Sequence, residues 1–258
     1  DETAAAPGIM DRLFALVLGK EEPTVPAGEQ TEAALPPETT EATTEATTEP
    51  TFPDPEHVVS TATIAATGDI LMHMPVVDTG LQTDGSYDFS SIFRYLEPYT
   101  TGVDYAVANL ETTLCGTDNG YPYHGYPNFN CPDEIVDGVL SAGFDMFLTA
   151  NNHSYDTSLV GYKRTIETVR GKGMDNLGMP AGSEDCVNIL YKDYSSDYKK
   201  VDTDGIARVL RNVAEEQPDL TIAMVHWGSE YNEEISTTQE KIRKQLLEGG
   251  VDIILGTH

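Results

Sequence analysis

The sequence has few basic residues, few cysteines and no long apolar run. Only 15 Lys and Arg stand against 43 Asp and Glu in 258 residues, which gives a formal net charge of −28. A surface this negative argues against nucleic acid or anionic lipid as partners, because both are polyanions. No apolar stretch reaches the roughly 18 residues that identify a transmembrane helix. The composition suits an extracytoplasmic protein, or a site where bound cations offset clustered carboxylates.

The three cysteines include no C-x-x-C pair, so a zinc ribbon is excluded. Cys115 and Cys131 flank a loop rich in Gly, Tyr, Pro and Asn. They form either a disulfide in an oxidising compartment or two free, partly buried thiols. A G-x-S-x-G nucleophile elbow, a Gly-rich phosphate loop and EF-hand spacing are also absent. The sequence therefore lacks the signals of serine hydrolases, P-loop nucleotide binding and calcium loops.

Residues 1–57 favour a disordered, acidic stalk. Residues 21–55 consist mostly of Thr, Glu, Pro and Ala, so too little can be buried to offset the entropy of ordering. The short apolar patch from Ile9 to Leu18 is expected to form a helical turn or two at most. The sequence opens on Asp1, and we expect an export signal or membrane tether to have been removed from its N-terminus. A plain interdomain linker is the alternative to a stalk.

Residues 58–258 are predicted to form one α/β domain. Apolar, β-branched runs predict strands at 58–67, 105–108, 145–150, 221–225 and 251–255. Apolar residues at helical spacing predict helices at 89–96, 132–142, 159–172, 203–216 and 237–248. Strands that alternate with helices and are apolar throughout indicate a sheet covered on both faces.

Polar side chains able to bind a metal or move a proton follow the predicted strands. They are Asp69, Asn109 with Glu111, Asn151 to His153, His226 and His258. Any one of them could be a turn or capping residue. Five such coincidences favour a site, because ligands gather beyond the carboxyl ends of parallel strands. Carboxylate, imidazole and amide donors together suit Mn, Fe or Zn, and two such ions can support an in-line displacement.

The order of these motifs resembles that of the bacterial CapA family of capsule or poly-γ-glutamate synthesis proteins, within the calcineurin-like metallophosphoesterase superfamily. The resemblance covers residue 58 to the end. It is carried by Gly68-Asp69, Asn109-Leu110-Glu111, Ala150-Asn151-Asn152-His153, His226-Trp227-Gly228 and Gly256-Thr257-His258. It implies a metallophosphoesterase-like αββα sandwich with a site for two divalent ions (Mn, Fe or Zn) at the strand ends.

The resemblance also implies a role for each motif residue. The implied metal ligands are Asp69, Glu111 in place of the superfamily's bridging aspartate, Asn152, His226 and His258. The implied catalytic residues are Asn152 and His153, with His153 beside the scissile group as acid or phosphate contact. His73 is either the histidine of the superfamily's first motif or, as we favour, a loop residue.

The sequence departs from the family in length as well as in Glu111, whose side chain reaches further than Asp. The family continues beyond His258 with a proline, another histidine and further strands. It also usually has another strand and loop where this sequence has only residues 182–187. We therefore expect this sequence to be a fragment, truncated at its C-terminus, or a set of joined pieces.

These features together predict a surface-tethered, extracytoplasmic CapA-like protein with a metal-dependent hydrolase site. The expected partners are an anionic polymer or a membrane complex that synthesises it. The alternative is a non-catalytic scaffold or polymer-binding subunit of such a complex, and a third reading is a phosphodiesterase of small substrates. The aromatic loop at residues 121–129 is either a substrate wall or a loop packed on its own domain.

Overall fold

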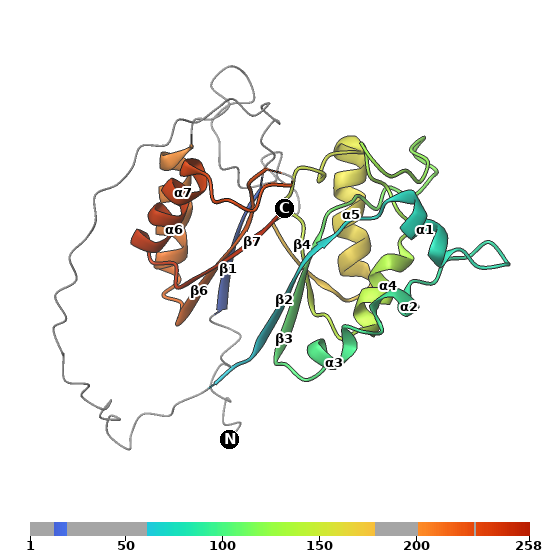
Figure 1. The fold of residues 1–258 in the computed structure, drawn as a ribbon, viewed down its shortest axis with the longest axis horizontal. Helices are drawn as coiled ribbons and strands as arrows, with labels where there is room; N and C mark the ends of the chain where they lie inside the picture. The colour runs from blue at the N-terminus through green and yellow to red at the C-terminus, as the bar shows by residue number, and fades with distance from the viewer. Residues whose placement is uncertain (1–12, 20–60, 179–200, 230) are drawn as a thin grey trace, which may run out of the picture. The chain divides into compact units, whose positions relative to one another are not determined.

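Two parallel β-sheets, with helices on their outer faces, make up the described chain (Figure 1). The structure is a computed structural model that describes residues 13–19, 61–178, 201–229 and 231–258. The four-stranded sheet has the order β2 (Ile64–Ile70), β3 (Tyr105–Leu110), β4 (Met146–Leu148), β5 (Asp175–Leu177). The three-stranded sheet has the order β1 (Leu13–Gly19), β6 (Leu220–His226), β7 (Ile253–Thr257). All these strand pairings are parallel, which confirms the predicted α/β class.

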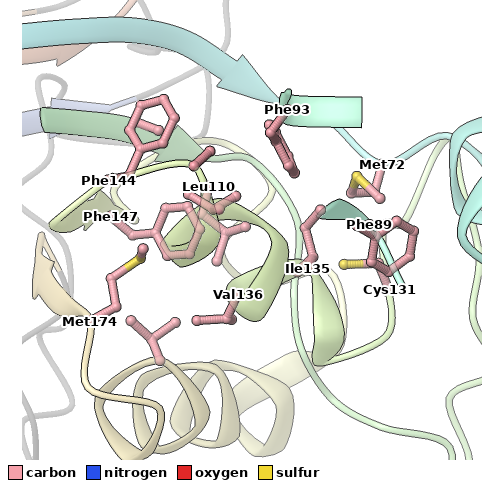
Figure 2. Packing of buried hydrophobic residues seen from close by; sticks show 14 of the residues in the cluster. Met72, Phe89, Phe93, Leu110, Cys131, Ile135, Val136, Phe144, Phe147 and Met174 are labelled. Carbon is pink, nitrogen blue, oxygen red and sulfur yellow. The ribbon is translucent and has the colours of Figure 1, made fainter. Parts of the chain in front are cut away.

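The helices are α1 (Met74–Gly80), α2 (Ser90–Phe93), α3 (Glu97–Thr100), α4 (Glu134–Ser141), α5 (Ser158–Gly171), α6 (Thr203–Glu215) and α7 (Thr237–Glu248). In the cluster of Figure 2, Ile135 and Val136 of α4 pack with Phe147 of β4, against the four-stranded sheet. Ile206 of α6 and Ile242 of α7 pack with other residues against the three-stranded sheet. Each sheet therefore has its own helical cover.

The inner faces of the two sheets meet in a third apolar cluster. Val107 and Leu148 come from one sheet, and Ile222 and Met224 from the other. Successive side chains of a strand point to opposite faces, so Ala106 and Ala108 of β3 join the helix-covered cluster while Val107 faces the second sheet. The order helix, sheet, sheet, helix is the predicted αββα sandwich.

The apolar patch near the N-terminus is a strand, so the expected helical turn is wrong. Leu13–Gly19 pairs in parallel with Leu220–His226 along seven residue positions. A short, continuously apolar run fits a buried strand as well as a helix, and pairing with β6 decides between them. Residues 13–19 thus belong to the sheet, while the rest of the predicted 1–57 stalk lies outside the described residues and stays a prediction.

Two other predicted boundaries are corrected. The helix expected at 89–96 is shorter, because α2 ends at Phe93, and a separate helix, α3, follows at Glu97–Thr100 with Pro98 in its first turn. The strand expected at 58–67 begins at Ile64 and continues to Ile70, with a register shift between Ala66 and Asp69. Helix α1 and strand β5 were not predicted, since both are short and lack a clear apolar period.

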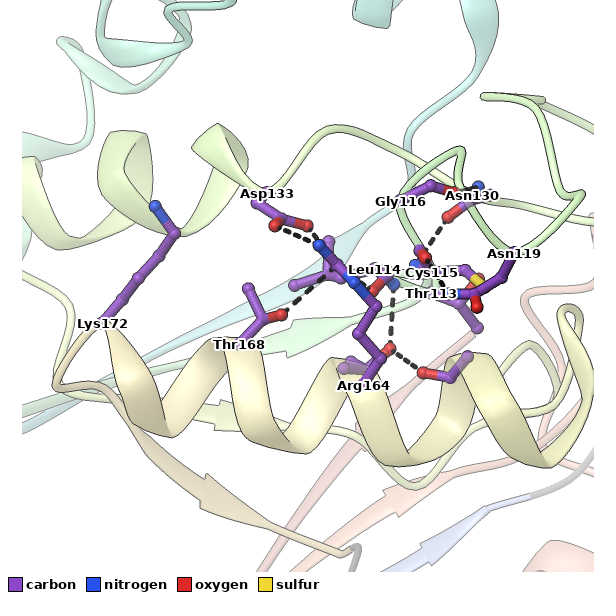
Figure 3. A network of polar contacts seen from close by, with 12 residues as sticks. Thr113, Leu114, Cys115, Gly116, Asn119, Asn130, Asp133, Arg164, Thr168 and Lys172 are labelled. Atoms are coloured by element: carbon purple, nitrogen blue, oxygen red, sulfur yellow. Dashed lines mark hydrogen bonds and ion pairs between the residues drawn. The ribbon is translucent and has the colours of Figure 1, made fainter.

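A polar network holds α5 against the chain that follows β3 (Figure 3). Arg164 donates to both carboxylate oxygens of Asp133, at 2.7 and 2.8 Å, and to the carbonyl oxygen of Leu114 at 2.6 Å. The Leu114 N–H donates in turn to Thr165 Oγ1 at 2.8 Å. These bonds fix the backbone three residues beyond Glu111 and so support the carboxyl end of β3.

Cys115 and Cys131 are both buried and both free, so the second of the two alternatives for this pair holds. Cys186 and the connection at 182–187 lie outside the described residues. None of the helices in the described ranges combines the length and apolar character that a bilayer-spanning helix needs.

Candidate metal centre

Asp69, Glu111 and His226 converge where strands of both sheets end. Asp69 pairs in register with Asn109, Glu111 directly follows β3, and His226 is the last residue of β6. One ligand atom from each of the three lies within 4.8 Å of the others. In the part of the chain that the structure describes, this is the one such group of acidic, His or Cys side chains.

The three side chains are close enough to share one ion. His226 Nε2 lies 3.4 Å from Glu111 Oε1, and His226 Nδ1 lies 3.7 Å from Asp69 Oδ1. Their side chains are 1%, 5% and 17% exposed for His226, Glu111 and Asp69, respectively. Charges removed from water to this degree need a counter-charge. Without a metal, a protonated His226 is the only positive charge within this group of three.

A chain of amides orients Asp69. Asn151 Nδ2 donates to Asn109 Oδ1 at 3.2 Å and to the carbonyl oxygen of Leu110 at 2.8 Å. Asn109 Nδ2 donates to Asp69 Oδ1 at 2.6 Å, and the same nitrogen lies 3.5 Å from His226 Nδ1. Asn109 and Asn151 are both buried. They therefore fix the carboxylate from the side of the four-stranded sheet.

The ionisation of the group follows from these contacts. Burial alone would lower the pKa of His226, but the carboxylates of Asp69 and Glu111 outweigh it and raise that pKa from 6.5 to about 9. Burial alone would raise the pKa of Asp69, but His226 and the hydrogen bond from Asn109 outweigh it and lower that pKa from 3.8 to about 2. A divalent cation would take over the charge-balancing part of protonated His226.

Asn152 and His153 lie on the turn after β4, next to this group. Asn152 Oδ1 is buried and, among the described residues, has no hydrogen-bond partner. His153 Nε2 lies 4.0 Å from Glu111 Oε1, and His153 Nδ1 lies 2.7 Å from Asp156 Oδ2. The structure thus brings His153 close to Glu111, and Asn152 precedes it on the same turn.

His258 and His73 lie outside the group of three. The ring of His258 stacks on that of His226, with centroids 4.7 Å apart and 28° between the planes. His73 occupies the N-cap position of α1, and its ring meets Phe129 edge-on at 5.0 Å. His73 thus lies at the end of the loop that precedes α1, and for both His73 and His258 a role as ligand stays a prediction.

The donor set fits a divalent transition metal. Two carboxylates and an imidazole are ligands that Mn, Fe and Zn accept. Among the described side chains, Asn152 Oδ1 and His226 Nε2 are buried atoms without a hydrogen bond, and such atoms call for a partner. A metal ion is a partner that both an amide oxygen and an imidazole nitrogen can take. Identity and number of ions stay predictions.

Sequence reasoning missed two residues of this region. Asp156 lies three positions after His153, and that spacing on one turn is a signal that could have found it. Phe129 packs edge-on against His153 at 4.6 Å. It comes from a loop whose course the sequence does not indicate, so no local pattern could have placed it there.

Two curated proteins are similar to the chain over most of its length. The chain is 28% identical over 226 residues to the capsule biosynthesis protein CapA of Bacillus anthracis, covering 76% of this chain and 54% of that protein. It is 23% identical over 214 residues to the PGA biosynthesis protein CapA of Bacillus subtilis (strain 168), covering 74% of this chain and 55% of that protein. The chain spans about half the length of these curated relatives.

The family model described as bacterial capsule synthesis protein PGA_cap matches residues 63–198 and 188–258. These matches include all the motif residues from Asp69 to His258 and both described sheets except β1. The chain belongs to the bacterial capsule synthesis protein PGA_cap family.

Proposed function

We propose that this protein acts in the synthesis of a capsule or poly-γ-glutamate-type anionic surface polymer through a metal-dependent hydrolase centre of the phosphoesterase type. The observation that carries the proposal is the convergence of Asp69, Glu111 and His226 at buried strand ends. Asn152 Oδ1, buried and without a hydrogen bond among the described residues, supports it. The names of the two relatives support the biological setting.

Each residue has a distinct part in this proposal. Asp69, Glu111 and His226 hold a cation, and Asn152 Oδ1 is an additional oxygen ligand. A bound divalent ion would supply polarisation of a phosphoryl oxygen and activation of water for attack. His153 lies near Glu111 and, when Nε2 carries a proton in addition to the one on Nδ1, donates a hydrogen bond or a proton from Nε2 to the scissile group.

A hollow beside Asp69 offers room for the group that is cleaved. Its volume is about 300 Å³, and residues 67–72 at the end of β2 form one wall. Ile92, Phe93 and Leu96 form another, so its lining is largely apolar. Poly-γ-glutamate itself contains no phosphorus, so the proposed phosphoester substrate is a different molecule from the finished polymer.

The proposal is tested by two assays on the same variants. Each purified variant is assayed for hydrolysis of a chromogenic phosphodiester. The same variants are expressed in cells that lack the native gene, and these cells are scored for surface polymer. We expect Asn152→Ala and His226→Ala to lose both, while Asn212→Ala, at an exposed position on helix α6, retains both. Unchanged hydrolysis and unchanged polymer in both site variants would contradict the proposal.

A non-catalytic scaffold is the second candidate function. The observation in its favour is that a protonated His226 pairs with both Asp69 and Glu111 without any metal, so the group can be a purely structural ion network. Metal that binds while the site variants still support polymer formation would favour this scaffold. Loss of polymer together with loss of hydrolysis would favour the enzyme.

We also propose that the protein works outside the cytoplasm, at the cell surface, attached to the membrane through the N-terminal side of the chain. The acidic composition and the Thr/Glu/Pro-rich residues 21–55 support this location. Its proposed partners are the anionic polymer or the membrane complex that makes it. Fractionation of cells and protease accessibility on intact cells test the location.

A further inference from the structure

Asp156 makes two hydrogen bonds through one oxygen atom. Its Oδ2 accepts from the backbone N–H of Phe129 at 2.6 Å and lies 2.7 Å from Nδ1 of His153. The His153 and Asp156 side chains are 12% and 10% exposed, so water competes little for either partner. A carboxylate that accepts from a backbone donor acts as an acceptor toward the imidazole too.

We propose that Asp156 is a positioning residue that fixes the tautomer and the ring orientation of His153, and that Phe129 holds this pair in place. The proposal rests on the proposed function insofar as it gives His153 a role in the reaction. With its proton on Nδ1, the imidazole presents Nε2 toward Glu111, at 4.0 Å from Oε1. A ring flip would exchange the two nitrogens and break the bond to Asp156.

Phe129 contributes through both its backbone and its ring. Its ring is 1% exposed and meets His153 edge-on, with centroids 4.6 Å apart at 87°. The same ring also meets His73 edge-on, with centroids 5.0 Å apart at 85°. The carbonyl oxygen of Phe129 accepts from Thr113 Oγ1 at 2.7 Å and from the Thr113 N–H at 3.3 Å.

These contacts connect the pair to the ligand edge of the sheet. Thr113 lies two residues beyond Glu111, so the same stretch of chain that positions the carboxylate ligand also anchors Phe129. The backbone N–H of Phe129 is one donor to Asp156 Oδ2, and the Nδ1–H of His153 is the other. Partners of this kind, one step removed from the reacting groups, decide which imidazole nitrogen faces the site.

The test compares Asp156→Asn and Asp156→Ala with Asp137→Asn as the matched control. Asp137 is a surface carboxylate paired with Lys172, so its substitution removes a charge without touching His153. Long-range proton–nitrogen NMR on the metal-free protein reports which nitrogen of His153 carries the proton, with His153→Gln used to assign the signals. Hydrolysis of the chromogenic phosphodiester gives kcat and KM for each variant.

We expect the Nδ1–H tautomer in the wild type and in Asp137→Asn, and its loss in both Asp156 variants. We expect kcat to fall about 10- to 100-fold in the Asp156 variants while KM changes little. An Nε2–H tautomer in the wild type, or one unchanged in Asp156→Asn, would overturn the inference. Failure of the proposed function is a separate result, because a wild type without hydrolase activity leaves the NMR test decisive.

Discussion

His226 Nε2 lies 3.4 Å from Glu111 Oε1, although the two residues come from different sheets. Glu111 follows β3 of the four-stranded sheet, and His226 ends β6 of the three-stranded one. The contact exists because the sheets pack face to face through Val107, Ile222 and their neighbours, with this pair near one end of that interface. The candidate centre is thus formed by the sandwich, and neither sheet alone supplies it.

Metal binding should release a proton from His226. In the metal-free protein its pKa is about 9, so at about pH 7.5 the imidazole is protonated and must lose its proton to become a ligand. We expect release of about one proton per His226-bound metal, and apparent affinity that rises about tenfold per pH unit up to about pH 9. Titration calorimetry in two buffers of different ionisation enthalpy measures the proton count.

The His226→Asn variant is the control for that experiment. It retains a polar side chain but has no proton to release in this pH range, so its residual binding should show no matching buffer dependence. Proton release that is equal in wild type and variant would assign the proton to another group.

The stability of the metal-free protein should fall as pH rises from about 6.5 to about 9. The folded pKa of His226 is raised, so its stabilising contribution is complete below pH 6.5 and is lost as pH rises through about 9. We expect a loss on the order of 2 kcal/mol in the free energy of unfolding, measured with urea in the presence of a chelator.

Asp69 gives the opposite dependence at the acid end. Its folded pKa is lowered to about 2, so its contribution is present above about pH 3.8 and is lost as pH falls through about 2. A His226→Gln variant should show neither the loss between pH 6.5 and 9 nor the full acid effect at Asp69. The same alkaline loss in that variant would contradict the assignment.

Asn151→Ala should weaken metal binding without changing any ligand. Asn151 holds Asn109, which donates to Asp69, so its removal frees the carboxylate to rotate. We expect metal affinity to fall about 10- to 100-fold, measured by competition with a chromogenic chelator. Asn232→Ala, whose side chain only caps an exposed turn at Glu234, should leave affinity unchanged.

Arg164→Met should destabilise the fold by about 1–2 kcal/mol, because it breaks a forked ion pair and leaves the carbonyl of Leu114 without this donor. Urea unfolding measures the effect. Lys172→Met is the control, since Lys172 pairs with the mostly exposed Asp137 and should cost less than about 1 kcal/mol. Equal losses of unfolding free energy in the two variants would mean that the Arg164 bonds drawn in Figure 3 contribute no more stability than the exposed Lys172 ion pair.

Cys115 and Cys131 should be unreactive in the folded protein. Both are buried, and burial raises the pKa of the Cys131 thiol, which suppresses the reactive thiolate. In a Cys186→Ser variant, a thiol reagent should label neither cysteine under native conditions and both in denaturant. Absence of labelling in denaturant would show that the two form a disulfide in solution.

The strand ends of the site could be predicted from the sequence because the chemistry is local there. An apolar run that stops at Asp69, Glu111 or His226 identifies both the strand and its functional end. Parallel pairing then brings Asp69 and Glu111 to one edge of their sheet, as the alternation of strands and helices implied. His226 meets them only because the two sheets pack face to face, which the sequence does not indicate. The αββα order was implied by the resemblance to the metallophosphoesterase superfamily, whereas the alternation of strands and helices indicated only an α/β sheet covered on both faces.

The rest depends on contacts between distant segments. Leu13–Gly19 is a strand because β6 pairs with it, and an isolated apolar run does not reveal that partner. The role of Phe129 depends on how a loop of Gly, Pro and Tyr returns to His153. The stacking of His258 on His226 likewise depends on the pairing of β6 with β7, which neither of the two separate histidine motifs reveals.

Elemental metal analysis of the purified protein tests the central claim most directly, with Asp69→Ala and His226→Ala as controls. The account predicts about two Mn, Fe or Zn ions per chain in the wild type, and their loss in both variants. A wild type that holds no more metal than Asp69→Ala would contradict the metal centre and leave the three residues as a structural ion network.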